Sequence, residues 1–155
     1  MQKNFIRYLK TTFGKTRESI TTIGHEIDLI EAYLDIFRVR MGKRLSYKIE
    51  FDKELRDIPF PSMLIQPIVE NAVKHGLEPK IDGGGIDIRI DRIEGGRIRW
   101  CIEDTGLGMS DTANKGTGLS NTLERMKTLY GNEGRLTIMD NQPTGVKVTL
   151  EMPYA

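Results

Sequence analysis

A glycine turn at Glu94-Gly95-Gly96 separates two runs in which apolar and polar residues alternate strictly. The apolar positions on the two sides of this turn are Ile86, Ile88, Ile90, Ile98, Trp100 and Ile102. Alternation with a period of two places such side chains on one face of a β-strand, and a turn this short joins antiparallel strands. The chain therefore contains a β-hairpin with one apolar face, which another part of the fold has to cover.

Further apolar patterns extend this hairpin into a sheet with helices. Alternation predicts three more strands, over 45–51, 136–138 and 146–150. Apolar spacings of three and four residues predict three helices, over about 22–41, around Glu70 and over 118–130. We expect an α+β fold, a two-layer sandwich in which helices cover one face of a mixed, mostly antiparallel sheet.

The N-terminal region has a heptad pattern. Apolar residues recur at steps of three and four from Ile6 to Met41, which indicates helix–helix packing or a dimer. Gly14 and Gly24 argue against one unbroken helix, because a glycine inside a helix costs about 1 kcal/mol relative to alanine. We therefore predict a first helix that ends near Phe13 and a separate second helix that ends at Met41.

Composition narrows the function classes. The 23 basic and 22 acidic residues give no overall case for nucleic-acid or membrane binding, and we interpret the basic excess in 1–17 as a solvated helix face. Cys101 is the single cysteine and lies in an apolar run, so we expect a small core residue. No apolar run approaches the ~18 residues of a membrane span. We expect a soluble, cytoplasmic domain whose parent protein could still be membrane-anchored.

The stretch 67–76 is predicted to be a helix with two unlike faces. Its apolar positions, with those just before it, can be buried against a sheet: Leu64, Ile65, Ile68, Val69, Ala72 and Val73. Four polar residues lie among them, and they form two pairs spaced four apart, Glu70 with Lys74 and Asn71 with His75. These side chains either form a functional site or belong to an ordinary surface edge with a Glu–Lys pair.

The first of two glycine-rich stretches is Asp104-Thr105-Gly106-Leu107-Gly108-Met109. Asp104 ends an apolar strand, where its carboxylate could accept a hydrogen bond from the exocyclic amine of adenine, whereas guanine carries a carbonyl at that position. Gly106 and Gly108 would let the backbone approach the base closely. The alternative is an aspartate that only starts a turn.

The second glycine-rich stretch is Lys115-Gly116-Thr117-Gly118-Leu119-Ser120-Asn121. Gly116 and Gly118 precede a predicted helix, whose free N–H groups and positive end suit a triphosphate. Lys115 and Lys74 could neutralise phosphate charge. An ordinary helix-capping loop is the alternative, and neither a P-loop nor a Rossmann fingerprint is present in the sequence.

In this order and spacing, the helix and the two glycine-rich stretches resemble the N, G1 and G2 boxes of the GHKL ATPase superfamily. More narrowly, the chain resembles the catalytic, ATP-binding domain of a bacterial sensor histidine kinase of the LytS/YesM-like branch, from about Ile6 to Pro153. The resemblance implies the Bergerat fold. It also implies a helical segment over 1–41, which ends a dimerisation helix and forms a linker helix, and a catalytic domain over 42–155.

The resemblance assigns roles to individual residues. Glu70 would be the catalytic base that polarises the nucleophile, Asn71 would bind Mg²⁺ through its side-chain carbonyl, and Asp104 would recognise adenine. The remaining ATP-binding positions are Lys74, His75, Gly106, Gly108, Met109, Lys115, Gly116, Thr117, Gly118 and Leu119. Many superfamily members have Gly-Thr where this chain has Gly145-Val146. Because of this departure, the adenine-holding role of that threonine is not transferred to Thr144 or Thr149.

The predicted function is transfer of the γ-phosphate of ATP to a histidine on a dimerisation domain that lies upstream of this chain. His25 is too close to Asn71 in sequence to be that acceptor, and we interpret it as an exposed residue near a helix start. The expected partners are ATP with Mg²⁺, the upstream dimerisation domain, a response regulator of the two-component system and a second copy of the chain, but not nucleic acid. The alternatives are a serine-directed or hydrolytic GHKL ATPase, and a non-catalytic dimerisation or scaffold module with a degenerate nucleotide site.

Overall fold

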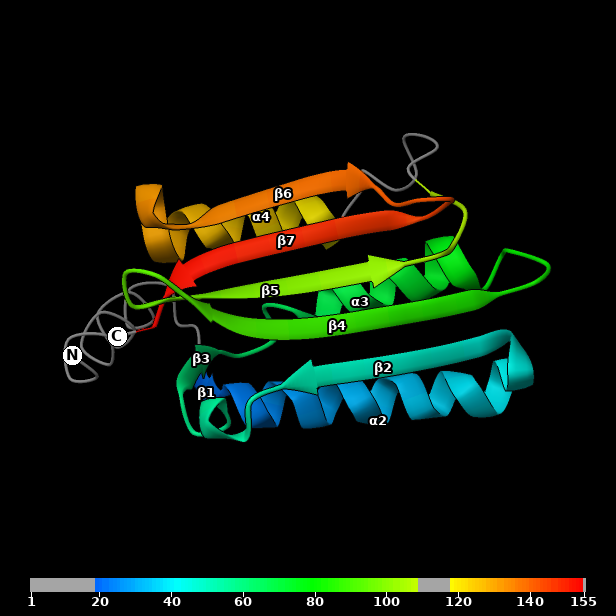
Figure 1. Ribbon diagram of the computed structural model, residues 1–155, viewed down its shortest axis with the longest axis horizontal. Coiled ribbons are helices and arrows are strands. Elements are labelled where there is room, and N and C mark those ends of the chain that lie inside the picture. The colour runs from blue at the N-terminus through cyan, green and yellow to red at the C-terminus, as the bar shows by residue number, and fades with distance from the viewer. Residues whose placement is uncertain (1–18, 109–117, 155) are drawn as a thin grey trace.

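The computed structural model describes residues 19–108 and 118–154, in which helices cover one face of a five-stranded sheet (Figure 1). The spatial order of the strands is β2 (Leu45–Phe51), β4 (Gly84–Ile93), β5 (Arg97–Asp104), β7 (Val146–Pro153) and β6 (Arg135–Asp140). The α-helices are α2 (Ile23–Met41), α3 (Gln66–Asn71) and α4 (Gly118–Tyr130). The predicted two-layer α+β sandwich is confirmed. The predicted first helix lies outside the described residues, and the domain boundary at residue 41 stays a prediction.

The pairing of the strands explains how a helix comes to lie beneath the sheet. Strand β4 pairs antiparallel with β5, β5 with β7, and β7 with β6, whereas β2 pairs parallel with β4. A parallel pair needs a crossover connection. Here the crossover runs from β2 through a 3₁₀ turn (Lys53–Leu55), β3 (Pro59–Pro61) and α3 before it reaches β4. The polar helix singled out in the sequence is therefore this crossover, and the topology places it against the sheet.

A small second sheet is formed by β1 (Ile20–Thr22) and β3, which pair antiparallel. The sequence patterns did not predict it, because a three-residue strand is too short to show a period, and prolines are tolerated at strand edges. Phe60 of β3 is fully buried, and its ring centroid lies 5.1 Å from that of Trp100 on β5. The small sheet thus connects the start of α2 to the main core.

Helix α2 uses its heptad residues within the domain. Thr22 caps the helix, since its hydroxyl accepts a hydrogen bond from the His25 backbone N–H at 3.1 Å. The buried stripe of α2 packs into the core and consists of Ile23, Ile27, Ile30, Leu34, Phe37 and Met41. Over residues 23–41 the heptad pattern therefore describes packing inside one chain. None of the described helices is both long and apolar enough to cross a membrane.

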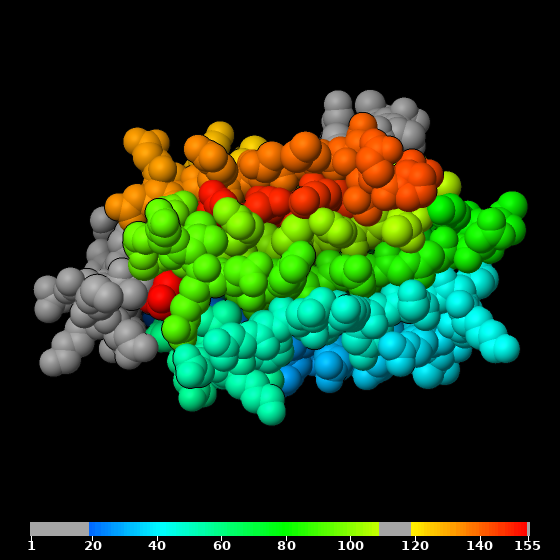
Figure 2. Space-filling view, viewed as in Figure 1, coloured from blue at the N-terminus to red at the C-terminus, as the bar shows by residue number. Residues whose placement is uncertain are grey.

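The other face of the sheet, which is turned to the viewer in Figure 2, has no described helix over it. It carries charged side chains. Oppositely charged residues form ion pairs along and across the strands: Lys48–Glu50, Arg89–Asp91, Arg99–Glu151 and Lys147–Glu103. Cys101 lies among these residues and is only partly buried, with its thiol donating to Glu103 at 3.7 Å. The expectation of a core cysteine was wrong, because Trp100 and Ile102 take the two inward positions beside it.

Candidate functional site

The polar helix changes its winding in the middle of the predicted site. Helix α3 continues into a π-helical segment, η3 (Ala72–Leu77), and Pro67 lies in the first turn, where its missing N–H costs no helical hydrogen bond. Among the predicted polar residues, Glu70 and Asn71 are half-buried, whereas Lys74 and His75 are exposed. π-Helical turns are rare and occur frequently at functional sites. The change of winding therefore falls at the place where the sequence predicts chemistry.

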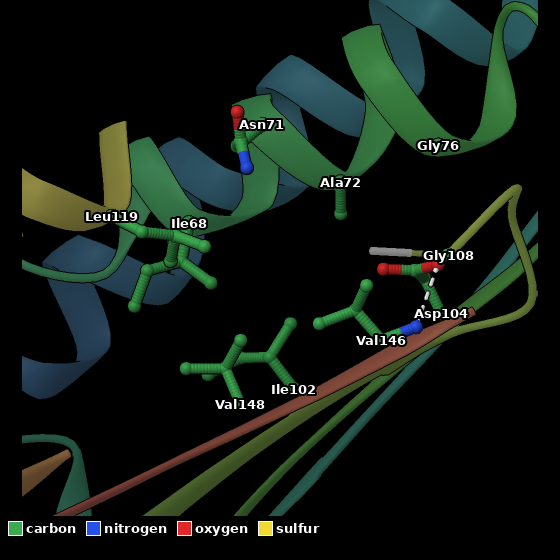
Figure 3. A pocket seen from close by; sticks show the side chains of 10 residues that line it. All are labelled: Ile68, Asn71, Ala72, Gly76, Ile102, Asp104, Gly108, Leu119, Val146 and Val148. Carbon is green, nitrogen blue, oxygen red and sulfur yellow. Dashed lines mark hydrogen bonds between the residues drawn. The ribbon is translucent and has the colours of Figure 1, made fainter. Parts of the chain in front are cut away.

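A cavity lies between this helix and the sheet (Figure 3). The space inside it that the centre of a water molecule can reach is about 20 Å³, and the wider non-atom space of about 410 Å³ includes open solvent. Its walls are mostly apolar, and its lining residues are Ile68, Asn71, Ala72, Gly76, Ile102, Asp104, Gly108, Leu119, Val146 and Val148. Figure 3 shows Asp104 beside Val146 on the sheet side, with Asn71 on the helix across from them. A flat apolar ligand with polar edges suits this cavity between α3 and the sheet, which is called the slot below.

Asp104 is the buried charged group of this cavity. The residue is 4% exposed, and its Oδ1 accepts hydrogen bonds from the backbone N–H groups of Gly106 at 2.9 Å and Val146 at 3.3 Å. Burial raises the pKa of Asp104 above its usual value, although these two N–H donors and the charge of Lys80 lower it. Within the described residues Oδ2 accepts no hydrogen bond, so it can accept one from a ligand in the cavity.

Two glycines of the first glycine-rich stretch have different neighbours. Gly108 lines the cavity with φ 94°, in the left-handed region that favours glycine. Gly106 packs against the π-helical segment, and a Cβ at this position would collide with the backbone of Gly76. Leu107 N–H also donates to Gly76 O at 3.0 Å. Because Gly106 has no side chain, the end of β5 can pack directly against the π-helical segment. The sequence did not predict this contact.

The predicted site residues divide into three groups. Asn71, Asp104, Gly108 and Leu119 meet at the cavity. Glu70, Lys74, His75 and Gly106 do not line it, and Gly118 begins α4. Met109, Lys115, Gly116 and Thr117 lie outside the described residues.

Glu70 is hydrogen-bonded within its own helix, and its charge acts on Tyr33 of α2. It accepts a hydrogen bond from Gln66 Nε2 at 3.3 Å, and no ion pair joins it to Lys74 in the described part of the chain. Burial and the nearby charges of Glu70 and Glu78 raise the pKa of Tyr33, on α2, to about 12. The alternative of an ordinary Glu–Lys surface pair is thus not what the structure contains.

Two polar residues that hold the site were missed in the sequence. Glu26 is fully buried and accepts three backbone N–H groups at the start of α3, from Met63, Ile65 and Gln66, at 2.9, 2.9 and 3.2 Å. Its position in the buried register of α2 was a signal that could have been used. Lys80 was missed without such a signal, because its partners are 25 and 64 residues away in sequence.

Gly145-Val146 stands where many superfamily members have Gly-Thr. The two nearby threonines, Thr144 and Thr149, are not among the residues described as lining the cavity. Thr149 pairs with Cys101 on the charged face of the sheet, which is the wrong side for a ligand. Thr144 lies in the β6–β7 turn, and its hydroxyl donates to Thr105 O at 3.3 Å. The backbone N–H of Val146, rather than a threonine side chain, contacts Asp104 here.

Comparison with known proteins identifies the fold around this cavity. Residues 56–155 match the family described as histidine kinase-, DNA gyrase B-, and HSP90-like ATPases. The chain belongs to this family. The predicted resemblance to the GHKL ATPase domain of histidine kinases is confirmed, and the family description supports ATP as the substrate.

Named relatives agree with this assignment. The chain is 31% identical to the sensor histidine kinase BtsS of Escherichia coli K12, over 96% of this chain and 27% of the relative. It is 30% identical to the sensor histidine kinase YesM of Bacillus subtilis, over 88% of this chain and 24% of the relative. The chain therefore spans about a quarter of the length of these relatives. The catalytic domain of the histidine kinase ThkA has the same fold, with a TM-score of 0.65 and 17% identity over 88% of this chain and 97% of that one.

Proposed function

We propose that this chain is the ATP-binding catalytic domain of a sensor histidine kinase, which transfers the γ-phosphate of ATP to a histidine on a dimerisation domain. The observation that carries the proposal is the buried Asp104, with one carboxylate oxygen available at the end of an apolar slot, in a chain of this ATPase family. The named relatives, which are sensor histidine kinases, support the kinase assignment over a hydrolytic or scaffold role.

The adenine ring would lie in the slot between α3 and the sheet. Ile68 and Ala72 on one side and Ile102 and Val148 on the other supply flat apolar contact. The available oxygen of Asp104 would accept the hydrogen bond of the adenine amine. Guanine would place a carbonyl oxygen against this carboxylate and leave a buried charge without a partner, which is how a site built for one hydrogen-bonding edge rejects another.

The phosphates would extend toward Asn71 and the start of α4. Mg²⁺ takes hard oxygen ligands and is commonly held by few protein groups together with substrate phosphates. The chemistry of the residues fits this mode: Asn71, whose side-chain amide contains a carbonyl oxygen, lines the cavity, and the described residues contain no cluster of acidic or histidine ligands that would form an all-protein site. Lys74 and His75 are exposed on the next helical turn, where they could contact phosphate oxygens. When bound, Mg²⁺ would neutralise the charge that develops on the transferred group.

Glu70 would act on the incoming nucleophile. A carboxylate that accepts the imidazole N–H of the acceptor histidine would increase the nucleophilicity of the other ring nitrogen. The acceptor would come from the dimerisation domain of the parent protein, and the phosphohistidine would pass its phosphoryl group to a response regulator. His25 is exposed at the start of α2 and has no role in this scheme.

Phosphotransfer in the parent protein tests the proposal. The 155-residue chain alone is expected to bind Mg²⁺-ATP without forming phosphohistidine, whereas the parent protein forms it. Glu70→Ala in the parent should reduce the rate of phosphohistidine formation by at least about a hundredfold, with ATP affinity retained. Stable phosphohistidine on the isolated chain, or full activity of the Glu70→Ala parent, would contradict the assigned roles.

A further inference from the structure

Lys80 joins three segments that are distant in sequence. Its half-buried side chain extends from the turn after η3, and Nζ donates to Thr105 O at 2.8 Å and to Thr144 Oγ1 at 3.3 Å. Thr144 Oγ1 lies at 3.3 Å from the same Thr105 oxygen. One ammonium group therefore connects the turn after the π-helical segment, the end of β5 and the β6–β7 turn.

These segments are the ones that hold Asp104 in place. Thr105 follows Asp104 directly, and its N–H and Oγ1 bond to Gly85 O and Gly85 N–H of β4, at 3.0 and 2.9 Å. On the other side, Asn141 Nδ2 donates to Asp104 O at 2.8 Å, and Val146 N–H donates to its carboxylate. Lys80 contacts both the residue after Asp104 and the turn that carries Asn141. Removal of the Lys80 side chain would therefore weaken the support of the Asp104 carboxylate both at Thr105 and at the β6–β7 turn.

The turn that carries Lys80 is itself held in place. The Arg44 guanidinium donates to the carbonyl oxygens of Glu78 at 2.8 Å, Lys80 at 2.7 Å and Ile81 at 3.0 Å. Arg44 comes directly before β2, so the turn is tied to the edge of the main sheet. A side chain on such a supported turn loses little conformational freedom when a ligand binds, which favours a fixed binding geometry.

The Lys80 ammonium, which donates to the carbonyl oxygen of Thr105 next to Asp104, also lowers the pKa of the Asp104 carboxyl through its charge. The neighbouring elements present backbone or apolar atoms to that carboxylate: Gly76 from η3, Gly106 from the loop and Val146 from β7. Glu103, on the same strand, points to the opposite face of the sheet and pairs with Lys147. A buried carboxylate without a nearby cation tends to bind a proton, and a protonated Asp104 would lose the acceptor that adenine needs.

We propose that Lys80 is a positioning residue for the adenine-recognising carboxylate, acting through Thr105, Thr144 and its own charge and not on the phosphates of ATP. This inference rests on the proposed function, because it concerns the same nucleotide site. It separates Lys80 from Lys74 and Lys115, the lysines that the sequence patterns associated with phosphate binding.

The test compares adenosine with ATP, since adenosine lacks the phosphates. In Lys80→Met, calorimetric titration should show the affinities for adenosine and for Mg²⁺-ATP falling by the same factor, about tenfold. The acid midpoint of ATP binding should move to higher pH, because removal of a cation raises the pKa of the carboxylate. Lys80→Arg, which keeps the charge, should retain the acid midpoint, and Lys53→Met, at an exposed lysine elsewhere, should change neither affinity.

The outcomes separate this inference from the proposed function. Weaker ATP binding with unchanged adenosine binding in Lys80→Met would show that Lys80 acts on the phosphates and would overturn the inference, as would no change in either affinity. A folded wild-type chain that binds neither ligand would instead contradict the proposed function. If Lys80→Met fails to fold, Thr144→Val provides the second variant: a twofold to threefold weaker adenosine affinity, on the order of one weak hydrogen bond, supports the inference, and an unchanged affinity overturns it.

Discussion

Two buried carboxylates in this molecule have similar surroundings and different uses. Glu26 on α2 is 0% exposed and Asp104 on β5 is 4% exposed. Both Glu26 oxygens accept backbone N–H groups, Oε1 from Met63 and Oε2 from Ile65 and Gln66. Asp104 receives both of its backbone donors on Oδ1. Burial alone therefore does not identify a binding group; an acceptor oxygen left available next to a cavity does.

The difference follows from where each carboxylate lies. Glu26 faces the start of α3, where the first N–H groups of a helix have no intrahelical partner. It fixes α2 to the helix that carries Glu70 and Asn71, and so contributes to the site from a distance. Asp104 lines the cavity, where its remaining acceptor is available to a ligand. Substitution of Glu26 should mainly lower the free energy of unfolding, whereas substitution of Asp104 should mainly lower the affinity for nucleotide.

The largest effect is expected for Glu26→Ala. Three buried N–H groups would lose their acceptor at a cost of about 1–3 kcal/mol each, so the free energy of unfolding should fall by roughly 3 kcal/mol or more. Urea denaturation measures this change. Glu31→Ala, at an exposed position of the same helix, should stay within about 0.5 kcal/mol of the wild type. An unaltered unfolding midpoint for Glu26→Ala would contradict the structural role that distinguishes Glu26 from Asp104.

Asp104→Asn should show the reverse pattern. The variant is nearly isosteric and can keep its acceptor for Gly106 and Val146, so the free energy of unfolding should change by less than about 1 kcal/mol. Its amide would present a donor to the adenine amine, and the affinity for ATP should fall by about a hundredfold or more. Calorimetry and urea denaturation on the same sample test both parts. Asp87→Asn, on the charged face, should alter neither quantity.

The pH dependence of ATP binding should also distinguish Asp104, the carboxylate proposed to bind the ligand, from Glu26. Burial raises the pKa of Asp104 above the ordinary 3.8, so the native state takes up this proton at a higher pH than the unfolded chain does. As pH falls through the raised value, protonation favours the folded state while ATP affinity decreases, because the acceptor is lost. Binding titrations from pH 8 downward should show this decline starting above the usual aspartate range. A wild-type affinity that stays constant down to about pH 4 would contradict it.

The smallest effect is expected for Gly76→Ala, which narrows the slot without a collision. The new Cβ would lie 3.4 Å from Asp104 Oδ1 and 3.7 Å from Gly106 Cα, which is close to ordinary contact. ATP should bind several-fold more weakly, with a stability change within about 1 kcal/mol. Gly42→Ala is the matched control, since its φ of 63° strains a side chain in open space. It should lower stability by about 1–2 kcal/mol and leave ATP affinity unchanged.

The sequence predicted the parts of this molecule that repeat with a regular period. The hairpin around Gly95, the limits of α4 and the helix ending at Met41 all follow from spacings of two or of three and four. The β1–β3 pair has no such signal, because its strands are too short. Cys101 was placed on the wrong face, since an apolar run read without its register does not distinguish inside from outside.

The candidate site was predicted in a similar way. Asp104 and Asn71 could be selected because a strand end and a helix face position them by local geometry. Contacts such as Lys80 with Thr144, or Glu26 with Ile65, join residues brought together by the crossover from β2 to β4 and by the last β-hairpin. No local pattern contains that information, so the residues that hold the site could not be found together with those that line it.

The central claim is that Asp104 recognises adenine, and nucleotide selectivity tests it most directly. Calorimetric titration of the wild-type chain with Mg²⁺-ATP and Mg²⁺-GTP should show ATP bound about a hundredfold or more tightly than GTP, and Asp104→Asn should lose that preference. Equal affinity of the wild type for the two nucleotides, or an intact preference for ATP in Asp104→Asn, would contradict the account.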